Sequence, residues 1–370
     1  MKVGFHVDQA WFSAPGGIGT YVAALAPALA DAGADVTLFR STWPSPAPEW
    51  ADRFPSVEVP GAIKTLYPAW NVVARPPLPQ YLAGCDVIHA TNHAAVPPVR
   101  PGQGLVVTVH DLAFDRYPEF FPREWRLLYR TGVRAAVKRA HALLVPSHST
   151  ASDLIDRGAD PARVHVTPLA PSLDARSDDP AAAVARLGVG EPYLLFVGML
   201  EPRKNLVRLI RAYRQVAPDV PHTLVLAGAD GWHGDELDDE LARPGPGRIV
   251  RTGRVEAAEL AALHRRASAF VYPSLYEGFG LPVLDAMARG VPVVTSDTSS
   301  LAEVAGDCAI LVDPTDVAEI AEGVHRLLTD PPAAADLAAR ALPRAAAYTW
   351  EATARATLEA YEAAVREASA

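Results

Sequence analysis

The sequence predicts an α/β protein made of two doubly wound parallel-sheet (Rossmann-like) domains that face a common cleft. Its 370 residues are about twice the length of a typical single domain. Short apolar runs rich in β-branched residues alternate with longer segments of helical period. These runs do not alternate apolar with polar residues, which is typical of strands buried on both faces of a parallel sheet.

The predicted strands fall into two sets along the chain. The first set is KVGFHV, DVTLF, DVIHA, GLVVTVH, HALLVPS and RVHVTPL. The second set is EPYLLFVG, HTLVLAG, RIVRTG, SAFVYPS, VPVVTSD and CAILVDP. The polar, Pro-containing segment SLDARSDDPAAAVARLGVGEP separates them, so we place the domains at residues 1–175 and 176–349.

Helical periodicity is clear in two segments. Residues 205–216 place Leu206, Leu209, Ile210 and Tyr213 on one face. Residues 350–370 form an Ala/Glu-rich helix that no strand follows.

Charge and composition exclude several classes of protein. A formal net charge of -9 argues against a nucleic-acid binder, so an anionic ligand must meet a local basic cluster. The residues after Met1 already form a strand and no apolar run approaches about 18 residues, so we expect a cytoplasmic protein. Cys85 and Cys308 lie outside any CxxC spacing and predict buried free thiols.

A glycine-rich turn follows the first strand, in APGGIGTYVAAL. Gly16 and Gly17 permit close backbone approach, and a helix starting near Thr20 would offer unpaired N–H groups to an anion. The third glycine of a dinucleotide fingerprint is missing, and Arg40 ends the second strand where such a domain has an acid. A plain tight turn remains the alternative.

Polar residues follow two other strands. GLVVTVH ends at His110, which would bond a substrate hydroxyl, carry a proton, or simply satisfy a buried carbonyl. Arg203 and Lys204 follow YLLFV just before a helix, and this placement favours a diphosphate ligand over a solvated positive pair.

The segment after SAFVYPS carries two carboxylates beside an anion-binding helix start. Glu277 precedes the turn Gly278–Gly280, and Asp285 lies one turn into the helix that Pro282 begins. Carboxylates repel phosphate, so the pair indicates hydroxyl groups, those of a sugar and a ribose. The structural alternative is that both residues only favour the helix N-terminus.

Metal and cofactor signals are weak. His89 and His93 have i, i+4 spacing but follow a strand, and no D-x-D triplet or GK[ST] loop is present. We therefore expect no metal and no cofactor, with Arg203, Lys204 and helix termini neutralising the phosphates.

A basic stripe lies in the first half of the chain, between Pro122 and Val145. Its members recur at spacings of 3, 4, 4 and 4, so one helix face carries them all: Arg123, Arg126, Arg130, Arg134 and Lys138. A solvated face is the plain interpretation; the sharper hypothesis is a peripheral contact with the inner face of a membrane or with a lipid phosphate.

Together these motifs resemble the retaining glycosyltransferases of the GT-B fold, family four (group 1). The resemblance covers nearly the whole chain, through GGIGTY, VHDLAF, GMLEPRKN, TGRVEAAEL and EGFGLPVLDAMARGVPVV in the family's order. It implies a GT-B architecture, with the final helix crossing back to the first domain.

The resemblance also implies roles for single residues. Glu277 would approach the transferred sugar and His110 would lie near its 6-hydroxyl, with Arg203 and Lys204 stabilising the leaving diphosphate. Asp285 would hold the ribose, although the family usually has the longer Glu there. The remaining donor-binding positions would be Gly17 at the diphosphate, Gly278, Phe279 and Gly280 at the sugar hydroxyls, Arg254 and Val255 at the nucleobase, and Gly16 and Leu281 beside them.

The resulting hypothesis is retaining transfer of a hexose from a nucleotide diphosphate sugar to an acceptor hydroxyl of a glycan, glycolipid or small molecule. The EPRKN block is similar to that of mannosyltransferases that use GDP-mannose, so we favour this donor over UDP- or dTDP-sugars. The alternatives are a sugar-nucleotide epimerase, a non-catalytic binding subunit and, third, a dehydrogenase.

Overall fold

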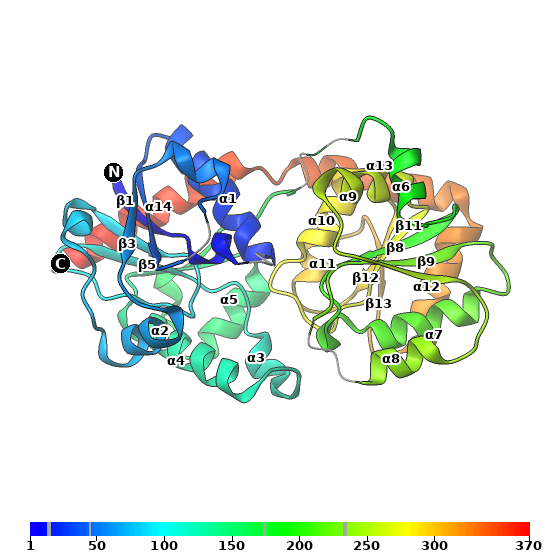
Figure 1. The fold of residues 1–370 in the computed structure, drawn as a ribbon, viewed down its shortest axis with the longest axis horizontal. Helices are drawn as coiled ribbons and strands as arrows, with labels where there is room; N and C mark the ends of the chain where they lie inside the picture. The colour runs from blue at the N-terminus through cyan, green and yellow to red at the C-terminus, as the bar shows by residue number, and fades with distance from the viewer. Residues whose placement is uncertain (13–15, 44–45, 173–174, 176, 232–234) are drawn as a thin grey trace. The chain divides into compact units, whose positions relative to one another are not determined.

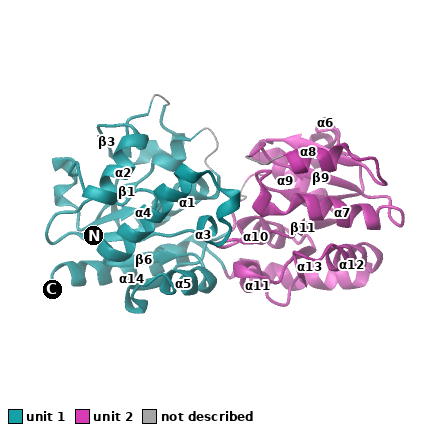
Figure 2. Cartoon of the chain, turned by 90° about the horizontal axis from the view of Figure 1, so that it is seen from below, with its two compact units in different colours: residues 1–170, 348–370 teal, residues 171–347 magenta. Residues whose placement is uncertain are grey.

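The structure is a computed structural model that describes residues 1–12, 16–43, 46–172, 175, 177–231 and 235–370. The chain divides into two compact units (Figures 1 and 2), residues 1–170 with 348–370 and residues 171–347. Each unit is a parallel sheet covered by helices, which confirms the predicted fold class. The dividing point lies five residues before the boundary expected from the linker composition.

Within its described residues, the first unit has a parallel sheet of seven strands in the order β3-β2-β1-β4-β5-β6-β7. The strands are β1 (Lys2–His6), β2 (Asp35–Ser41), β3 (Ser56–Val59), β4 (Val87–Ala90), β5 (Gly104–Thr108), β6 (Ala142–Val145) and β7 (Val164–Val166). The sequence prediction missed β3, because this edge strand is largely exposed and reads SVEV without an apolar run. The order reverses between β1 and β4.

Helices cover both faces of this sheet. They are α1 (Gly16–Asp31), α2 (Ile63–Val73), α3 (Ala113–Arg116), α4 (Arg123–Arg139), α5 (His148–Ile155) and α14 (Trp350–Ala368). Short 3-10 turns are η1 (Asp8–Trp11), η2 (Glu49–Arg53), η3 (Gln80–Gly84), η4 (Pro118–Phe120) and η5 (Pro161–Arg163). The expected start of α1 near Thr20 is wrong, since Gly16, Gly17 and Gly19 already belong to the helix.

The final helix is built into the first unit. α14 packs on α1 and on β5, as the red helix beside the blue N-terminal elements shows in Figure 1. Its Tyr361 is fully buried, and the Tyr361 hydroxyl lies 2.7 Å from Nδ1 of His89. The other ring nitrogen of His89 lies 2.7 Å from the Thr108 hydroxyl, so one imidazole joins α14 to β4 and β5.

The second unit repeats the architecture with six strands in its described residues, in the order β10-β9-β8-β11-β12-β13. The strands are β8 (Tyr193–Val197), β9 (Thr223–Ala227), β10 (Ile249–Gly253), β11 (Ala269–Tyr272), β12 (Val293–Ser296) and β13 (Ile310–Val312). The order reverses between β8 and β11. Ligands of open parallel sheets bind beyond the carboxyl ends of the strands at such a reversal.

The helices of the second unit form two layers. They are α6 (Pro180–Arg186), α7 (Leu206–Val216), α8 (Asp235–Ala242), α9 (Ala257–Arg266), α10 (Leu281–Ala288), α11 (Ser299–Ala305), α12 (Val317–Thr329) and α13 (Pro331–Ala346), with η6 (Pro202–Lys204) before α7. α7 packs on α12 and α10 packs on α13. The predicted apolar face of α7 is buried. In the described part of the chain, no helix combines the length and the hydropathy that a bilayer crossing requires.

Candidate functional site

The reversal of strand order in the second unit brings together the residues predicted after two separate strands. η6 follows β8 and carries Arg203 and Lys204, while Glu277 follows the neighbouring strand β11. Because the carboxyl ends of β8 and β11 lie side by side, residues some seventy positions apart converge on one point.

The Glu277 carboxylate is held by hydrogen bonds to both of its oxygens. Oε1 accepts from Lys204 Nζ at 2.6 Å, from the Ser274 hydroxyl at 2.7 Å and from the Tyr272 hydroxyl at 3.0 Å. Oε2 lies 2.8 Å from Nη1 of Arg203. Glu277 is 8 % exposed, so this carboxylate is fixed in a largely dehydrated place.

The two cations keep Glu277 ionised. Burial alone would raise the pKa of the Glu277 carboxyl, but the positive charges of Arg203 and Lys204 outweigh it and hold the pKa at about 2. A carboxylate with this pKa carries its charge at neutral pH, so it cannot donate a proton there and is a weak base. Its fitting role is electrostatic.

Lys204 is the most buried cation of this cluster. Burial and the neighbouring Arg203 lower the pKa of the Lys204 ammonium, against the opposing effect of Glu277 and Glu201. Glu201 is itself buried and accepts a hydrogen bond of 2.6 Å from Nη2 of Arg203. Two carboxylates thus balance two cations, in a compact group whose geometry is set before any ligand arrives.

The backbone on both sides of this cluster is fixed by side chains. The Ser299 hydroxyl accepts from the Glu277 amide at 3.1 Å, and the Ser300 hydroxyl donates to the Glu277 carbonyl at 2.8 Å. Ser299 adopts a left-handed φ of 52°, an unfavourable conformation for serine. Asn205 is left-handed as well, and its Nδ2 donates to the Pro273 carbonyl oxygen at 3.0 Å, which ties η6 to the end of β11.

The predicted glycine turn lies between Glu277 and α10. Gly280 has a φ of 100° and is the N-cap residue of α10, and a Cβ atom there would lie 2.6 Å from Cδ2 of Leu301. Gly278 and Phe279 are buried, while Leu281 is half-buried in the first turn of the helix. The N-terminus of α10, with its partial positive charge, therefore lies next to the Glu277 cluster.

Asp285 lies in α10 as predicted, but its carboxylate already has partners. Oδ1 accepts from the Ser172 amide at 2.7 Å and Oδ2 accepts from the Ser172 hydroxyl at 2.6 Å. Asp285 is 7 % exposed. In this structure it fastens the first residues of the second unit to α10, and the expected contact with a ribose stays a prediction.

The other donor-binding candidates belong to other elements of the two units. Arg254 and Val255 directly follow β10, at the edge of the second sheet, with Arg254 exposed. Gly16, Gly17 and His110 belong to the first unit, and their part in one site with Glu277 stays a prediction.

In the first unit, His110 follows β5 and is fixed by one hydrogen bond. Its Nε2 donates to the carbonyl oxygen of Thr91 at 2.8 Å, so the neutral ring presents Nδ1 as an acceptor. Burial lowers the pKa of His110, which favours this neutral form. The imidazole can therefore accept a hydrogen bond from a hydroxyl group.

The sequence interpretation missed the polar partners of the Glu277 cluster. Tyr272 and Ser274 both belong to SAFVYPS, which was predicted as a strand from its apolar residues. Glu201 was passed over beside its basic neighbours. The available signal was their position at the carboxyl ends of β8 and β11, where polar side chains meet a ligand or each other.

No metal site emerges from the two histidines that were considered for one. Both ring nitrogens of His89 are used within the first unit, and His93 packs against the rings of Phe114 and Tyr129. Among the described residues, no group of three or more His, Cys, Asp or Glu side chains is arranged to hold a metal ion.

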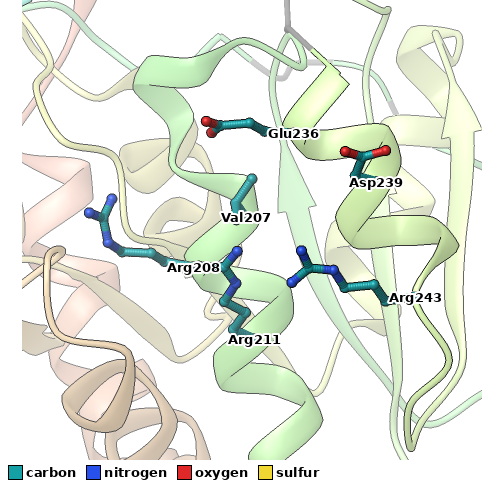
Figure 3. A pocket seen from close by; sticks show the side chains of 6 residues that line it. All are labelled: Val207, Arg208, Arg211, Glu236, Asp239 and Arg243. Atoms are coloured by element: carbon teal, nitrogen blue, oxygen red, sulfur yellow. The ribbon is translucent and has the colours of Figure 1, made fainter.

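A separate pocket in the second unit lies between α7 and α8 (Figure 3). Arg211 of α7 and Arg243, which directly follows α8, both line it. Both bind the buried carboxylate of Glu240, at 2.8 and 3.2 Å, and two further acids, Glu236 and Asp239, line the same pocket. Arg208 lines the pocket as well, so arginines and acids are mixed along its walls, and it includes none of the predicted site residues.

Comparison with known sequences decides the family. The pattern of the family described as Glycosyl transferases group 1 matches residues 180–343, and that of Glycosyltransferase Family 4 matches residues 15–174. The chain belongs to this glycosyltransferase family. The O-antigen chain mannosyltransferase B of Escherichia coli is 35 % identical over 70 % of each chain. A D-inositol 3-phosphate glycosyltransferase of Frankia alni is 32 % identical over 96 % of each chain.

Solved structures confirm the GT-B architecture of this glycosyltransferase. HepE of Anabaena, in a complex with UDP and glucose, superposes with a TM-score of 0.75 at 22 % identity, over 97 % of this chain and 98 % of that one. Sucrose-phosphate synthase of Thermosynechococcus elongatus gives 0.74 at 22 % identity, over 98 % of each chain.

Proposed function

We propose that this glycosyltransferase moves a hexose from a nucleotide diphosphate sugar to an acceptor hydroxyl, with retention at the anomeric carbon. The observation that carries the proposal is the pairing of ionised Glu277 with Arg203 and Lys204 at the strand-order reversal of the second unit. Cations and a carboxylate side by side match the two charges that separate when a glycosyl–phosphate bond breaks.

Each charge of the cluster has a role in this mechanism. Arg203 and Lys204 would bind the diphosphate as negative charge develops on its leaving oxygen, aided by the N-terminus of α10. Glu277 would stabilise the positive charge that develops on the sugar ring. Because the Glu277 network exists before the ligand binds, little rearrangement is needed in the transition state.

For the retention that we propose, Glu277 is a poor nucleophile and a poor base. Three donors surround its Oε1, and its low pKa makes it a weak base. We therefore assign front-face departure and attack. The glycosyl–oxygen bond to the diphosphate breaks, the acceptor oxygen bonds to the anomeric carbon from the same face, and the acceptor proton passes to the departing phosphate oxygen.

For the donor we propose GDP-mannose. The name of the Escherichia coli relative is that of a mannosyltransferase, and the EPRKN block agrees with such enzymes. We further propose that the reaction needs no metal and no cofactor, with Arg203, Lys204 and the N-terminus of α10 donating hydrogen bonds to the diphosphate.

The experiment is an incubation of the purified protein with GDP-mannose and a panel of UDP- and dTDP-sugars, with EDTA and without acceptor. Release of one nucleoside diphosphate by slow hydrolysis, absent from the Glu277→Gln variant, supports the proposal and names the donor. Formation of an isomerised nucleotide sugar would replace it with an epimerase. Turnover that requires added Mg²⁺ would overturn the metal-independent part.

A further inference from the structure

The first unit carries a second basic cluster, far in sequence from the Glu277 cluster. A cavity of about 500 Å³ lies beside α4, and its lining includes four cations, Arg130, Arg134, Lys138 and Arg157. The first three belong to the stripe predicted from the sequence, and Arg157 comes from the segment after α5. Arg126, another member of the stripe, instead donates to the Pro118 carbonyl at 3.1 Å.

One buried carboxylate organises this cluster. The Asp115 side chain is 6 % exposed, and its Oδ1 lies 2.6 Å from Nε of Arg130. Its Oδ2 pairs with the Arg157 guanidinium. Two guanidinium groups from separate segments are thereby fixed side by side, with further N–H donors available at the cavity.

The charge of this cavity is not balanced within the protein. Arg134 and Lys138 are exposed, and neither forms an ion pair or a side-chain hydrogen bond with the residues that the structure describes. Four cations therefore face a single carboxylate, in a chain whose net charge is -9. The pocket between α7 and α8 differs, because two acids, Glu236 and Asp239, line it together with its arginines (Figure 3).

We propose that the cavity beside α4 binds a phosphoryl group. A phosphate oxygen accepts from several N–H donors at once, and convergent guanidinium groups are the arrangement that proteins use for it. Val133 and Val137 line the same cavity, and Leu127, earlier on α4, is 65 % exposed. The phosphoryl group can thus belong to a soluble phosphate compound or to a lipid head group. This site is independent of the proposed donor site.

Two probes distinguish the sources in experiments on the full chain. Calorimetry with inorganic pyrophosphate tests a soluble ligand, and sedimentation with phosphatidylcholine vesicles, with and without phosphatidylglycerol, tests a lipid phosphate. The test variant is Arg134→Glu with Lys138→Glu. The control is Lys64→Glu with Arg355→Glu, which reverses two exposed cations of the same unit and changes the net charge equally.

We expect the test variant to bind pyrophosphate, phosphatidylglycerol vesicles or both about tenfold more weakly than the wild type and the control do. Pyrophosphate bound by the second unit is common to all three proteins and cancels in the comparison. A difference with pyrophosphate assigns a soluble ligand, and a difference with vesicles alone assigns a lipid. Equal binding by test variant and control in both arms would overturn the proposal.

A second variant, expected to change binding in the opposite direction, distinguishes loss of the site from loss of folding. Asp115→Asn removes the negative charge between Arg130 and Arg157 while it keeps the shape of the side chain. It should bind the same probe more tightly than the wild type, an effect that unfolding cannot produce. Unchanged or weaker binding by a folded Asp115→Asn protein would contradict a site centred on these two arginines.

Discussion

Lys204 Nζ lies 2.6 Å from Glu277 Oε1, with the two side chains only 9 and 10 % exposed. A charged pair so far removed from water is costly to form, and truncating one partner leaves the other buried without compensation. Such a pair adds little to the stability of the fold, but it holds two charges in fixed places. Parallel measurements of turnover and of unfolding separate these two roles.

The first prediction concerns the charge of Glu277. Glu277→Gln should lower turnover of the donor sugar by about 10²- to 10³-fold, because stabilisation of the developing positive charge is lost. Affinity for the nucleoside diphosphate product should stay or rise, since an anion beside the phosphate site is removed. The matched control is Glu240→Gln, which also removes a buried carboxylate from its arginine partners, outside the site. Equal loss of turnover in both variants would reduce Glu277 to a structural role.

The second prediction concerns Tyr272, whose hydroxyl accepts from Lys204 at 2.7 Å and donates to Glu277 at 3.0 Å. Tyr272→Phe should lower turnover about tenfold, because Lys204 and Glu277 lose their common partner. Tyr193→Phe is the control. Tyr193 lies in the same sheet as Tyr272, and its buried hydroxyl donates to the Leu263 carbonyl oxygen of α9 at 2.7 Å. Both variants should unfold about 1 kcal/mol more easily. Only Tyr272→Phe should change turnover, and steady-state kinetics beside denaturant unfolding checks this.

The third prediction follows from the pKa of Glu277, about 2 in the folded protein against an ordinary value of 4.5. Because the folded pKa lies below the unfolded one, Glu277 stabilises the protein above about pH 4.5, and this contribution disappears as the pH falls toward 2. The loss is about 3 kcal/mol at most. Urea unfolding at pH 5 and at pH 3 should show a smaller decrease in Glu277→Gln than in the wild type. Parallel decreases would show that the carboxyl group titrates normally.

The fourth prediction separates two roles of Asp285. If Asp285 only holds Ser172, then Asp285→Ala should lower the free energy of unfolding by about 1–3 kcal/mol with an unchanged KM for the donor. If it also binds the ribose, KM should rise in Asp285→Ala and not in Ser172→Ala. The structure, in which both carboxylate oxygens already bind Ser172, leads us to expect the first result. A donor KM raised in Asp285→Ala alone would restore the ribose role.

The sequence predicts the fold and the centre of the site for one physical reason. Buried parallel strands are recognisable as apolar runs, and the residues that follow them must gather at one edge of the sheet. The sequence alone therefore predicts that Arg203, Lys204 and Glu277 lie close together. It does not predict which atoms they contact, because hydrogen-bond partners depend on side-chain directions that packing decides.

Each feature that the sequence did not predict has its own physical cause. The edge strand β3 has exposed polar residues, so it lacks the apolar run that marks the inner strands. The start of α1 was placed too late because glycine is a weak helix former, yet Gly16 and Gly17 belong to the helix. The hydrogen bonds of Asp285 to Ser172 join residues 113 positions apart, which no local pattern reports.

The most direct test of the central proposal is calorimetric binding of nucleoside mono- and diphosphates, with guanine, uracil and thymine bases, to the wild type and Lys204→Gln. Glutamine keeps a hydrogen-bond donor on this side chain but lacks the charge. We predict that one diphosphate binds the wild type more tightly than its monophosphate does, and that Lys204→Gln weakens the diphosphate at least about tenfold and leaves the monophosphate unchanged. Equal affinity of wild type and Lys204→Gln for every diphosphate would contradict the assignment of the Glu277 cluster as the diphosphate site.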